Sequence, residues 1–98
     1  MIKKNNKTFN ALDRKYSLGE AEKKYHIQQW ENPYESTIAF NKYLSAKLKK
    51  SQKIIDIGSG TGGSTYFISK NYKHCNFTGI DYSKKYIEIG NQILKEVE

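Results

Sequence analysis

The stretch that decides the fold reads Ile54-Ile55-Asp56-Ile57-Gly58-Ser59-Gly60-Thr61-Gly62-Gly63-Ser64-Thr65. A short apolar run that ends in a carboxylate is typical of a strand, and the hydroxyl residues after the glycines are suited to starting a helix. We therefore predict a strand, a loop and a helix in succession. The four glycines remove every Cβ from the turn, so backbone N–H groups can approach a polar small molecule lying across the helix N-terminus.

The segments around this stretch predict a β-α-β-α order. We expect a buried strand over 53–57, a helix over 62–71 and a second strand over 76–81, which also ends in a carboxylate. Ser83 is a candidate cap for a final helix, whose apolar positions repeat at helical spacing: Tyr86, Ile89, Ile93 and Val97. Such units place their strands parallel and adjacent, so Asp56 and Asp81 should share the sheet edge at which open α/β sheets bind ligands.

Two more helices are expected before the first strand. Residues 18–30 contain helix formers, with Ala21, Tyr25 and either Gln28 or Gln29 on one stripe. Asn32-Pro33-Tyr34-Glu35 is a helix-start signal, and the helix that it begins should end near Lys50. We interpret residues 1–17 as a flexible N-terminal arm, with a turn of helix near Phe9 to Leu12.

Composition limits the chain to one small domain. It has 98 residues, of which 37% are hydrophobic and 28% charged, with a single proline, which is typical of a globular protein. No apolar run is long enough to span a membrane and the N-terminus lacks a signal-peptide pattern, so we expect a cytoplasmic protein with no membrane partner.

Cysteine and histidine are too few to indicate a metal or redox site. Cys75 is the single cysteine, so no internal disulfide can form, and His26 and His74 are too scattered to build a metal cluster with it. The neighbours His74 and Cys75 could form a base and a nucleophile, but a loop histidine beside a half-buried thiol is the favoured interpretation.

The positive charge is concentrated in the first half of the sequence. Residues 1–53 carry 12 Lys and Arg against 5 Asp and Glu, whereas residues 54–98 carry 5 of each. An anionic partner, such as a phosphate-bearing substrate, nucleic acid or an acidic membrane surface, could use such a surface. We favour the simpler interpretation, in which the lysines lie on solvent-exposed faces of helices.

The glycine loop matches two cofactor motifs. Gly58, Gly60 and Gly63 satisfy G-x-G-x-x-G, and Asp81 follows about 20 residues on, as in the dinucleotide fingerprint. Asp56 argues against a pyrophosphate, because its negative charge lies directly before the loop. The carboxylate of Asp56 suits a cationic ligand better.

The sequence resembles the class I S-adenosylmethionine-dependent methyltransferases. Their first motif is similar to D-x-G-x-G-x-G, which Asp56, Gly58, Gly60 and Gly62 fill here. Their second signature, an acidic residue that ends the second strand, is matched by Asp81 in Gly79-Ile80-Asp81-Tyr82-Ser83.

This resemblance implies a cofactor site for S-adenosyl-L-methionine. The backbone from Gly58 through Ser59 to Gly60 would line its methionyl and ribose portion, Asp56 would meet its amino group, and Asp81 would accept from the ribose hydroxyls. Tyr82 would pack against the adenine, with loop packing as the alternative, and Asp81 could instead be a capping carboxylate.

The resemblance also implies a lid formed by the helices at 18–50. Tyr25 and Trp30 are candidates to close the site, although packing without ligand contact is the favoured interpretation for both. We assign no catalytic residue and no metal site.

The family fold is a Rossmann-like, seven-stranded sheet, of which only two strands are expected here. We therefore interpret residues 18–98 as a partial methyltransferase domain, inactive alone, that a second chain or a missing C-terminal half would complete. The expected function is the cofactor-binding portion of a methyltransferase acting on a small molecule. The alternatives are an NAD(P)-binding oxidoreductase fragment, which rests on the G-x-G-x-x-G match, and a non-enzymatic nucleic-acid-binding or regulatory module, which rests on the basic charge.

Overall fold

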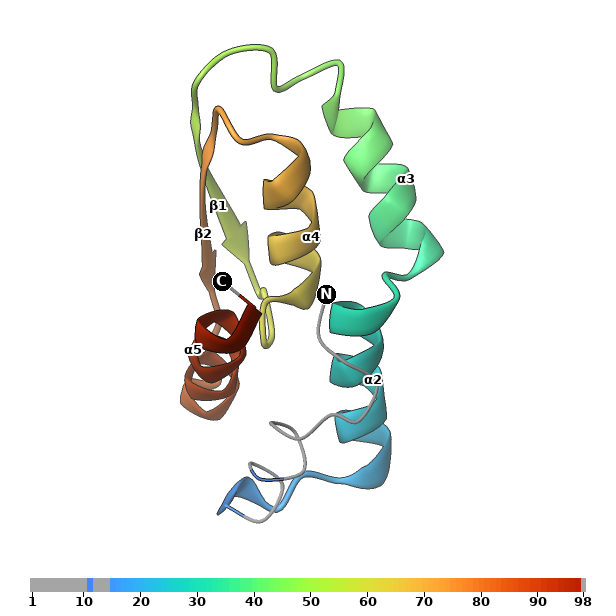
Figure 1. Cartoon of the computed structure of the whole chain (residues 1–98), viewed down its shortest axis with the longest axis vertical. Coiled ribbons are helices and arrows are strands. Elements are labelled where there is room, and N and C mark those ends of the chain that lie inside the picture. Colours follow the sequence, from blue (N-terminus) through green and yellow to red (C-terminus); the bar gives the residue numbers. More distant parts are fainter. Residues whose placement is uncertain (1–10, 12–14, 98) are drawn as a thin grey trace.

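The structure, a computed structural model, describes residue 11 and residues 15–97 (Figure 1). In chain order its elements are α2 (Glu20–Glu31), α3 (Glu35–Leu44), β1 (Lys53–Ile57), α4 (Gly63–Asn71), β2 (Asn76–Ile80) and α5 (Lys84–Val97). The expected β-α-β-α order is confirmed. Most of the predicted N-terminal arm, including the turn of helix near Phe9 to Leu12, lies outside the described residues apart from Ala11.

The two strands pair in parallel, as predicted. The register joins Asp56 to Gly79 and Ile57 to Ile80, so the strands end side by side. β1 has the predicted bounds, and Asp81 is the first residue after β2. Both chain segments that leave the strands therefore start from the same edge of the sheet (Figure 1).

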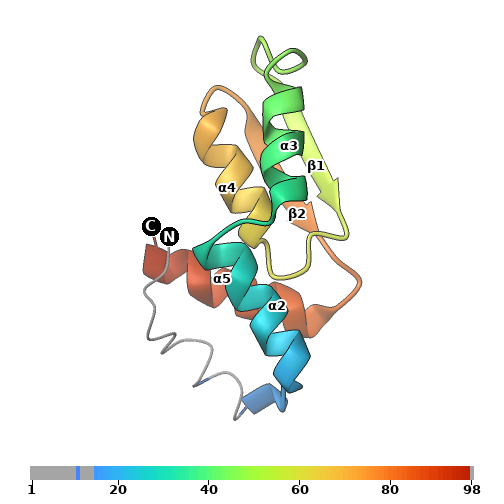
Figure 2. The same ribbon diagram turned by 90° about the vertical axis from the view of Figure 1, so that its right-hand side faces the viewer.

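The helices form two groups around this sheet. α3 and α4 lie along one face of the strands, whereas α2 and α5 lie at the end where the strands finish (Figures 1 and 2). None of the helices among the described residues is both long and apolar enough to cross a membrane. The fold thus brings α2, a segment distant in sequence, next to the glycine loop.

Two clusters of buried side chains hold these groups together. One joins α2 and α5 and is built from Leu18, Trp30, Ile89 and Ile93, the last two with no exposed surface. The other lies between α4 and the strands and is built from Leu48, Ile68, Tyr72 and Cys75. The apolar repeat predicted for the last helix is therefore confirmed, because Ile89 and Ile93 form the centre of the first cluster.

The prediction that the first strand is buried was wrong for one of its faces. Ile55 is 63% exposed and Ile57 is 81% exposed, and Ile80 of β2 is 45% exposed. Ile54 and Phe77 point the other way and pack on the second cluster. Successive side chains of a strand alternate between faces, and α3 and α4 cover only one of the two.

The predicted apolar stripe of the first helix was also wrong. Ala21 is exposed and Tyr25 is 49% exposed, whereas His26 and Trp30 are buried. α2 packs through the side that carries Glu22, His26 and Trp30, which are four residues apart and so share one face. Polar contacts to the loop and to α5 determine which side of α2 packs against the rest of the protein. The spacing of hydrophobic residues in the sequence does not indicate these polar contacts.

The bounds predicted for the second helix need correction at both ends. Asn32 is the C-cap of α2, and Tyr34 is the N-cap of α3. The residue before a proline is pushed out of helical geometry, and Asn32 accordingly has φ −151° and ψ 88°. At the other end the helix stops at Leu44, because the chain turns through residues 45–47 to bury Leu48 beside α4.

A methyl group at Gly90 tests the packing of α5 on the loop. An added Cβ there would lie 2.2 Å from the carbonyl oxygen of Thr61, which cannot move without displacing the loop. We expect Gly90→Ala to lower the free energy of unfolding by about 1–3 kcal/mol, although alanine is the better helix former. Urea unfolding followed by circular dichroism measures this change.

Gly19→Ala is the matched control, because a Cβ at Gly19 would meet only Glu22 Cβ at 3.9 Å. It should change the unfolding free energy by about 1 kcal/mol or less. Equal stability of the Gly90→Ala variant and the unmodified chain would contradict the described contact between α5 and the loop.

Candidate functional site

The loop between β1 and α4 depends on glycine at three positions. Gly58, Gly60 and Gly62 have φ of 77°, 62° and 93°, a backbone region that other residues rarely adopt. These are the three glycines of the D-x-G-x-G-x-G pattern. Their spacing therefore reflects the path of the backbone as well as room for a ligand.

Most of the loop N–H groups are used inside the protein. Gly58 N and Ser59 N donate to the carbonyl oxygen of Ile80 at 2.8 and 2.9 Å, and Gly62 N donates to Ser59 O at 3.0 Å. Gly60 N donates to Asp81 Oδ2 at 2.8 Å. These four N–H groups therefore have acceptors inside the protein, which are supplied by Ile80, Asp81 and the loop itself.

Asp81 links the loop to the last helix. Its second carboxylate oxygen, Oδ1, accepts from Ser83 N at 2.8 Å, and Ser83 Oγ accepts from Tyr86 N at 3.2 Å, which caps α5 as predicted. The N–H groups of Ser83 and Gly60 lower the pKa of the Asp81 carboxyl. Each of its oxygens retains a lone pair for a further donor, so capping and ligand binding are compatible.

A cleft of about 410 Å³ lies between this edge of the sheet and α2, and we call it the Asp81 cleft. The loop contributes Gly58, Ser59 and Gly60 to its wall. The remaining lining comes from the residue after β2, from α5 and from α2: Asp81, Tyr86, Glu22, Tyr25, His26 and Gln29. α2 therefore covers the loop at the position where the resemblance placed a lid.

Asp56 lies in a neighbouring cleft of about 440 Å³, the Asp56 cleft, between α3 and the sheet. Its Oδ2 accepts from Thr65 Oγ1 at 2.5 Å. The two clefts share Tyr25, Gln29, Gly58 and Ser59, so the loop separates the two carboxylates. The structure thus divides the predicted site residues between two adjoining clefts.

The remaining predicted residues take different positions. Ser59 is buried, lines both clefts and donates through Oγ to Ile80 O at 3.3 Å. Gly62 is the N-cap of α4. Tyr82 is fully exposed beside Asp81 and lines neither cleft.

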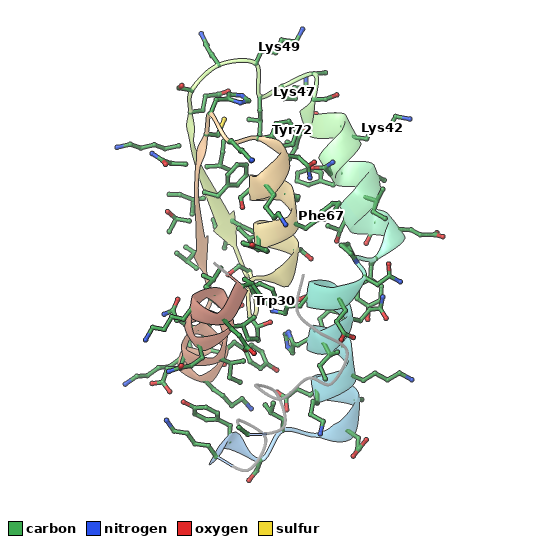
Figure 3. All side chains as sticks on the ribbon, viewed as in Figure 1. Trp30, Lys42, Lys47, Lys49, Phe67 and Tyr72 are labelled. Carbon is green, nitrogen blue, oxygen red and sulfur yellow. The ribbon has the colours of Figure 1, made fainter. Side chains whose placement is uncertain are left out.

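Of the two candidate lid residues, Tyr25 borders both clefts and Trp30 borders neither. Trp30 is only 2% exposed, and its Nε1 donates to Thr61 Oγ1 at 3.0 Å (Figure 3). Trp30 therefore packs beneath the loop and does not close a cleft, which is the packing interpretation that the sequence favoured.

Three side chains of the Asp81 cleft were not predicted as site residues from the sequence: Glu22, His26 and Tyr86. Glu22 accepts from the Tyr86 hydroxyl, from Gly19 N and from Lys85 Nζ, the last at 3.2 Å. The Tyr86 hydrogen bond and then the Gly19 N–H lower the pKa of Glu22 to about 2, and Glu22 in turn raises the pKa of Tyr86 to about 12. The four-residue spacing of Glu22, His26 and Trp30 was the feature of the sequence that could have shown that these side chains share one face of α2.

His26 lies against the loop with little exposed surface. Its Nδ1 is 3.2 Å from Thr61 Oγ1, and its ring lies 4.5 Å from the Tyr86 ring. Burial lowers the pKa of His26, so the neutral imidazole is favoured. Thr61 thereby joins both buried side chains of α2 to the loop.

The charge of this region suits a cationic or hydroxyl-bearing ligand. Three carboxylates, Glu22, Asp56 and Asp81, line the two clefts, and no lysine or arginine among the described residues does so. In the described part of the chain no group of three or more His, Cys, Asp and Glu could hold a metal. Cys75 is buried, and His74 Nε2 lies 2.8 Å from Leu48 O, which supports the loop-histidine interpretation of that pair.

The parallel β-α-β-α unit with its glycine loop is part of a Rossmann-like fold. Residues 48–98, just over half of the chain, match the family described as a methyltransferase domain. The chain therefore belongs to the methyltransferase domain family, and it carries part of that domain.

Two curated proteins are similar to part of this chain. A protein of Papaver bracteatum named "Probable (S)-tetrahydroprotoberberine N-methyltransferase 2" is 40% identical over 53 residues, which are 54% of this chain and 14% of that protein. The (S)-tetrahydroprotoberberine N-methyltransferase of Eschscholzia californica is 44% identical over 46 residues, which are 44% of this chain and 13% of that protein. The similarity thus spans about a seventh of these relatives. No solved structure matches the chain.

The Glu22 contacts predict a pH-dependent stability. Because the folded-state pKa of about 2 lies below the ordinary value of 4.5, the stabilisation is complete above 4.5 and is lost as the pH falls toward 2. We expect Glu22→Gln to lower the unfolding free energy by about 1–3 kcal/mol near neutral pH. Urea unfolding at a series of pH values should show this difference shrinking in acid.

Glu20→Gln, at an exposed position of the same helix, is the control and should have little effect at any pH. A difference for Glu22→Gln that stays constant down to the acid limit would contradict the contacts of Glu22 with Tyr86 and Lys85.

Proposed function

We propose that this chain forms the S-adenosyl-L-methionine-binding portion of a cytoplasmic methyltransferase that acts on a small molecule. One observation carries the proposal: the carboxylate that ends β2 is bonded to the middle of the glycine loop, at the wall of a cleft that α2 covers. The two motifs of the family resemblance therefore meet in one place. Methyltransferases of this family generally use this cofactor.

The residues of the two clefts fit the charge of that cofactor. S-adenosylmethionine carries an ammonium and a sulfonium, and the sulfonium activates its methyl group for transfer. In the proposal Asp81 accepts from the ribose hydroxyls, Asp56 attracts the ammonium, and the backbone at Gly58 to Gly60 lies along the cofactor. Tyr82, whose side chain is fully exposed beside Asp81, is available to cover the adenine.

The alternative of an NAD(P) site receives less support from the loop. A pyrophosphate needs free N–H groups, but those of Gly58, Ser59, Gly60 and Gly62 already have acceptors. Asp56 and Asp81 on either side would repel its negative charge. These contacts favour a cationic ligand over an anionic one.

The Asp56 cleft is proposed as the region that faces the methyl acceptor. Beyond Asp56, which the cofactor ammonium would occupy, its wall is apolar and includes Phe40, Leu44 and Phe77. Such a cleft suits an amine on an apolar skeleton, and both relatives are named as N-methyltransferases. We therefore propose a nitrogen atom as the methyl acceptor.

The bare face of the sheet is proposed as the place where the rest of the domain packs. Parallel sheets are usually covered on both faces, whereas Ile55, Ile57 and Ile80 are open to solvent here. The covering layer would come from the same polypeptide or from a second chain. The activity of the whole enzyme depends on it.

Isothermal titration calorimetry with S-adenosyl-L-methionine tests the cofactor assignment. We expect binding to the full chain that weakens at least about tenfold in Asp81→Asn, because the neutral amide is a weaker acceptor for the ribose hydroxyls. NADH should not bind. The thermal midpoint of each variant shows whether the fold is intact.

Glu96→Gln removes one carboxylate from an exposed position of α5 and should leave the affinity unchanged. Unaltered affinity in a folded Asp81→Asn variant would overturn the ribose contact, and tighter binding of NADH than of S-adenosylmethionine would overturn the proposed cofactor.

A further inference from the structure

The end of the molecule opposite the two cofactor motifs is uniformly basic. It is formed by the end of α3, the segment that leads into β1 and the turn between α4 and β2 (Figure 1). These segments carry seven exposed lysines: Lys42, Lys47, Lys49, Lys50, Lys53, Lys70 and Lys73. We call this end the basic pole.

The basic pole has no carboxylates to balance its charge. Residues 36–55 and 66–80, which contain all seven lysines, include no Asp or Glu. The carboxylates Glu22, Asp56 and Asp81 lie at the clefts instead. The lysines therefore produce a one-signed field at one end of the molecule, which the sequence alone could not separate from scattered solvated helix faces.

Exposed apolar side chains of α3 lie beside these lysines. Phe40 is 52% exposed and Tyr43 is 57% exposed, and α3 has no fully buried residue. The two rings are stacked with centroids 6.0 Å apart, and Lys47 Nζ lies 5.6 Å from the centre of the Tyr43 ring. Figure 3 shows Lys42, Lys47 and Lys49 around the point where α3 turns toward β1.

We propose that the basic pole binds the surface of a membrane rich in anionic lipids. Clustered lysines beside exposed aromatic side chains suit such a surface, because the ammonium groups remain among the headgroups while the rings enter the acyl boundary. The sequence predicted no membrane partner, and that expectation rested on the lack of a spanning segment. Binding at the surface needs no such segment.

A lipid surface fits these residues better than a nucleic acid does. The pole contains lysines and no arginine. It therefore offers ammonium groups but no planar guanidinium group, which would form bidentate hydrogen bonds with phosphates and base edges. Phe40 and Tyr43 already stack on each other, which leaves less ring surface for a base. Diffuse attraction to many headgroups needs neither feature.

This arrangement would leave the Asp81 cleft accessible. The pole lies at the starting ends of the strands, whereas the glycine loop and Asp81 follow their finishing ends. A chain bound through the pole would thus hold the Asp81 cleft away from the lipid, whereas the Asp56 cleft, which Phe40 lines, would open beside the membrane surface. The inference concerns location and does not depend on which cofactor the clefts take.

Co-sedimentation of the full chain with vesicles tests the proposal. We expect binding to phosphatidylcholine vesicles that contain about one-third phosphatidylserine, and weak binding to pure phosphatidylcholine. The triple variant Lys42→Gln, Lys47→Gln, Lys49→Gln should lower the partition coefficient about 100-fold, since each lysine near the surface contributes about fivefold. Tyr43→Ser should lower it about tenfold.

The matched control is Lys24→Gln, Lys84→Gln, Lys95→Gln, which removes the same charge from exposed positions of α2 and α5. It should bind within about threefold of the unmodified chain. Circular dichroism shows whether each variant is folded.

Three results would overturn the proposal. They are a lack of binding to the anionic vesicles, an equal loss in the two triple variants, and preference for a single-stranded oligonucleotide over the vesicles at the same ionic strength.

Discussion

The arrangement of this chain depends on close approach to a loop that has almost no side chains. A Cβ at Gly79 would lie 2.7 Å from Ser59 Oγ, and one at Gly63 would lie 2.9 Å from the backbone of Gln29. These contacts bring β2 against the loop and α2 against the start of α4, directly after the loop. The loop can therefore be held from several directions at once, which a turn built from larger residues would prevent.

The polar contacts follow from that steric arrangement. With the loop against the end of β2, Ile80 O and the Asp81 carboxylate satisfy its N–H groups, and Asp81 then caps the start of α5. With α2 against the loop, Thr61 meets both Trp30 and His26. One carboxylate and one hydroxyl thus connect segments that are 21 to 35 residues apart in sequence.

The sequence predicted what depends on local chemistry and missed what depends on which faces meet. The glycines, the capping Ser83 and the apolar repeat of α5 are local signals, and the strands, the last helix and the position of Asp81 follow from them. Glu22 and Tyr86 come together only because α2 crosses the loop, and no periodicity encodes that crossing. The exposed face that carries Ile55 and Ile57 was missed for a related reason. An apolar run predicts a strand, but it does not indicate whether one or both faces of that strand are covered.

The one-sided covering of the sheet has a consequence for the order of folding. The cluster of Leu48, Ile68, Tyr72 and Cys75 joins β1, α4 and β2 through contacts that are short in sequence and complete on one face. Contacts of this kind form early, because closing a short loop has a small entropic cost. This layer therefore needs no partner on the face of the isoleucines in order to form. Ile55, Ile57 and Ile80 then remain exposed after the layer has formed, and their face is free to order whatever packs on it.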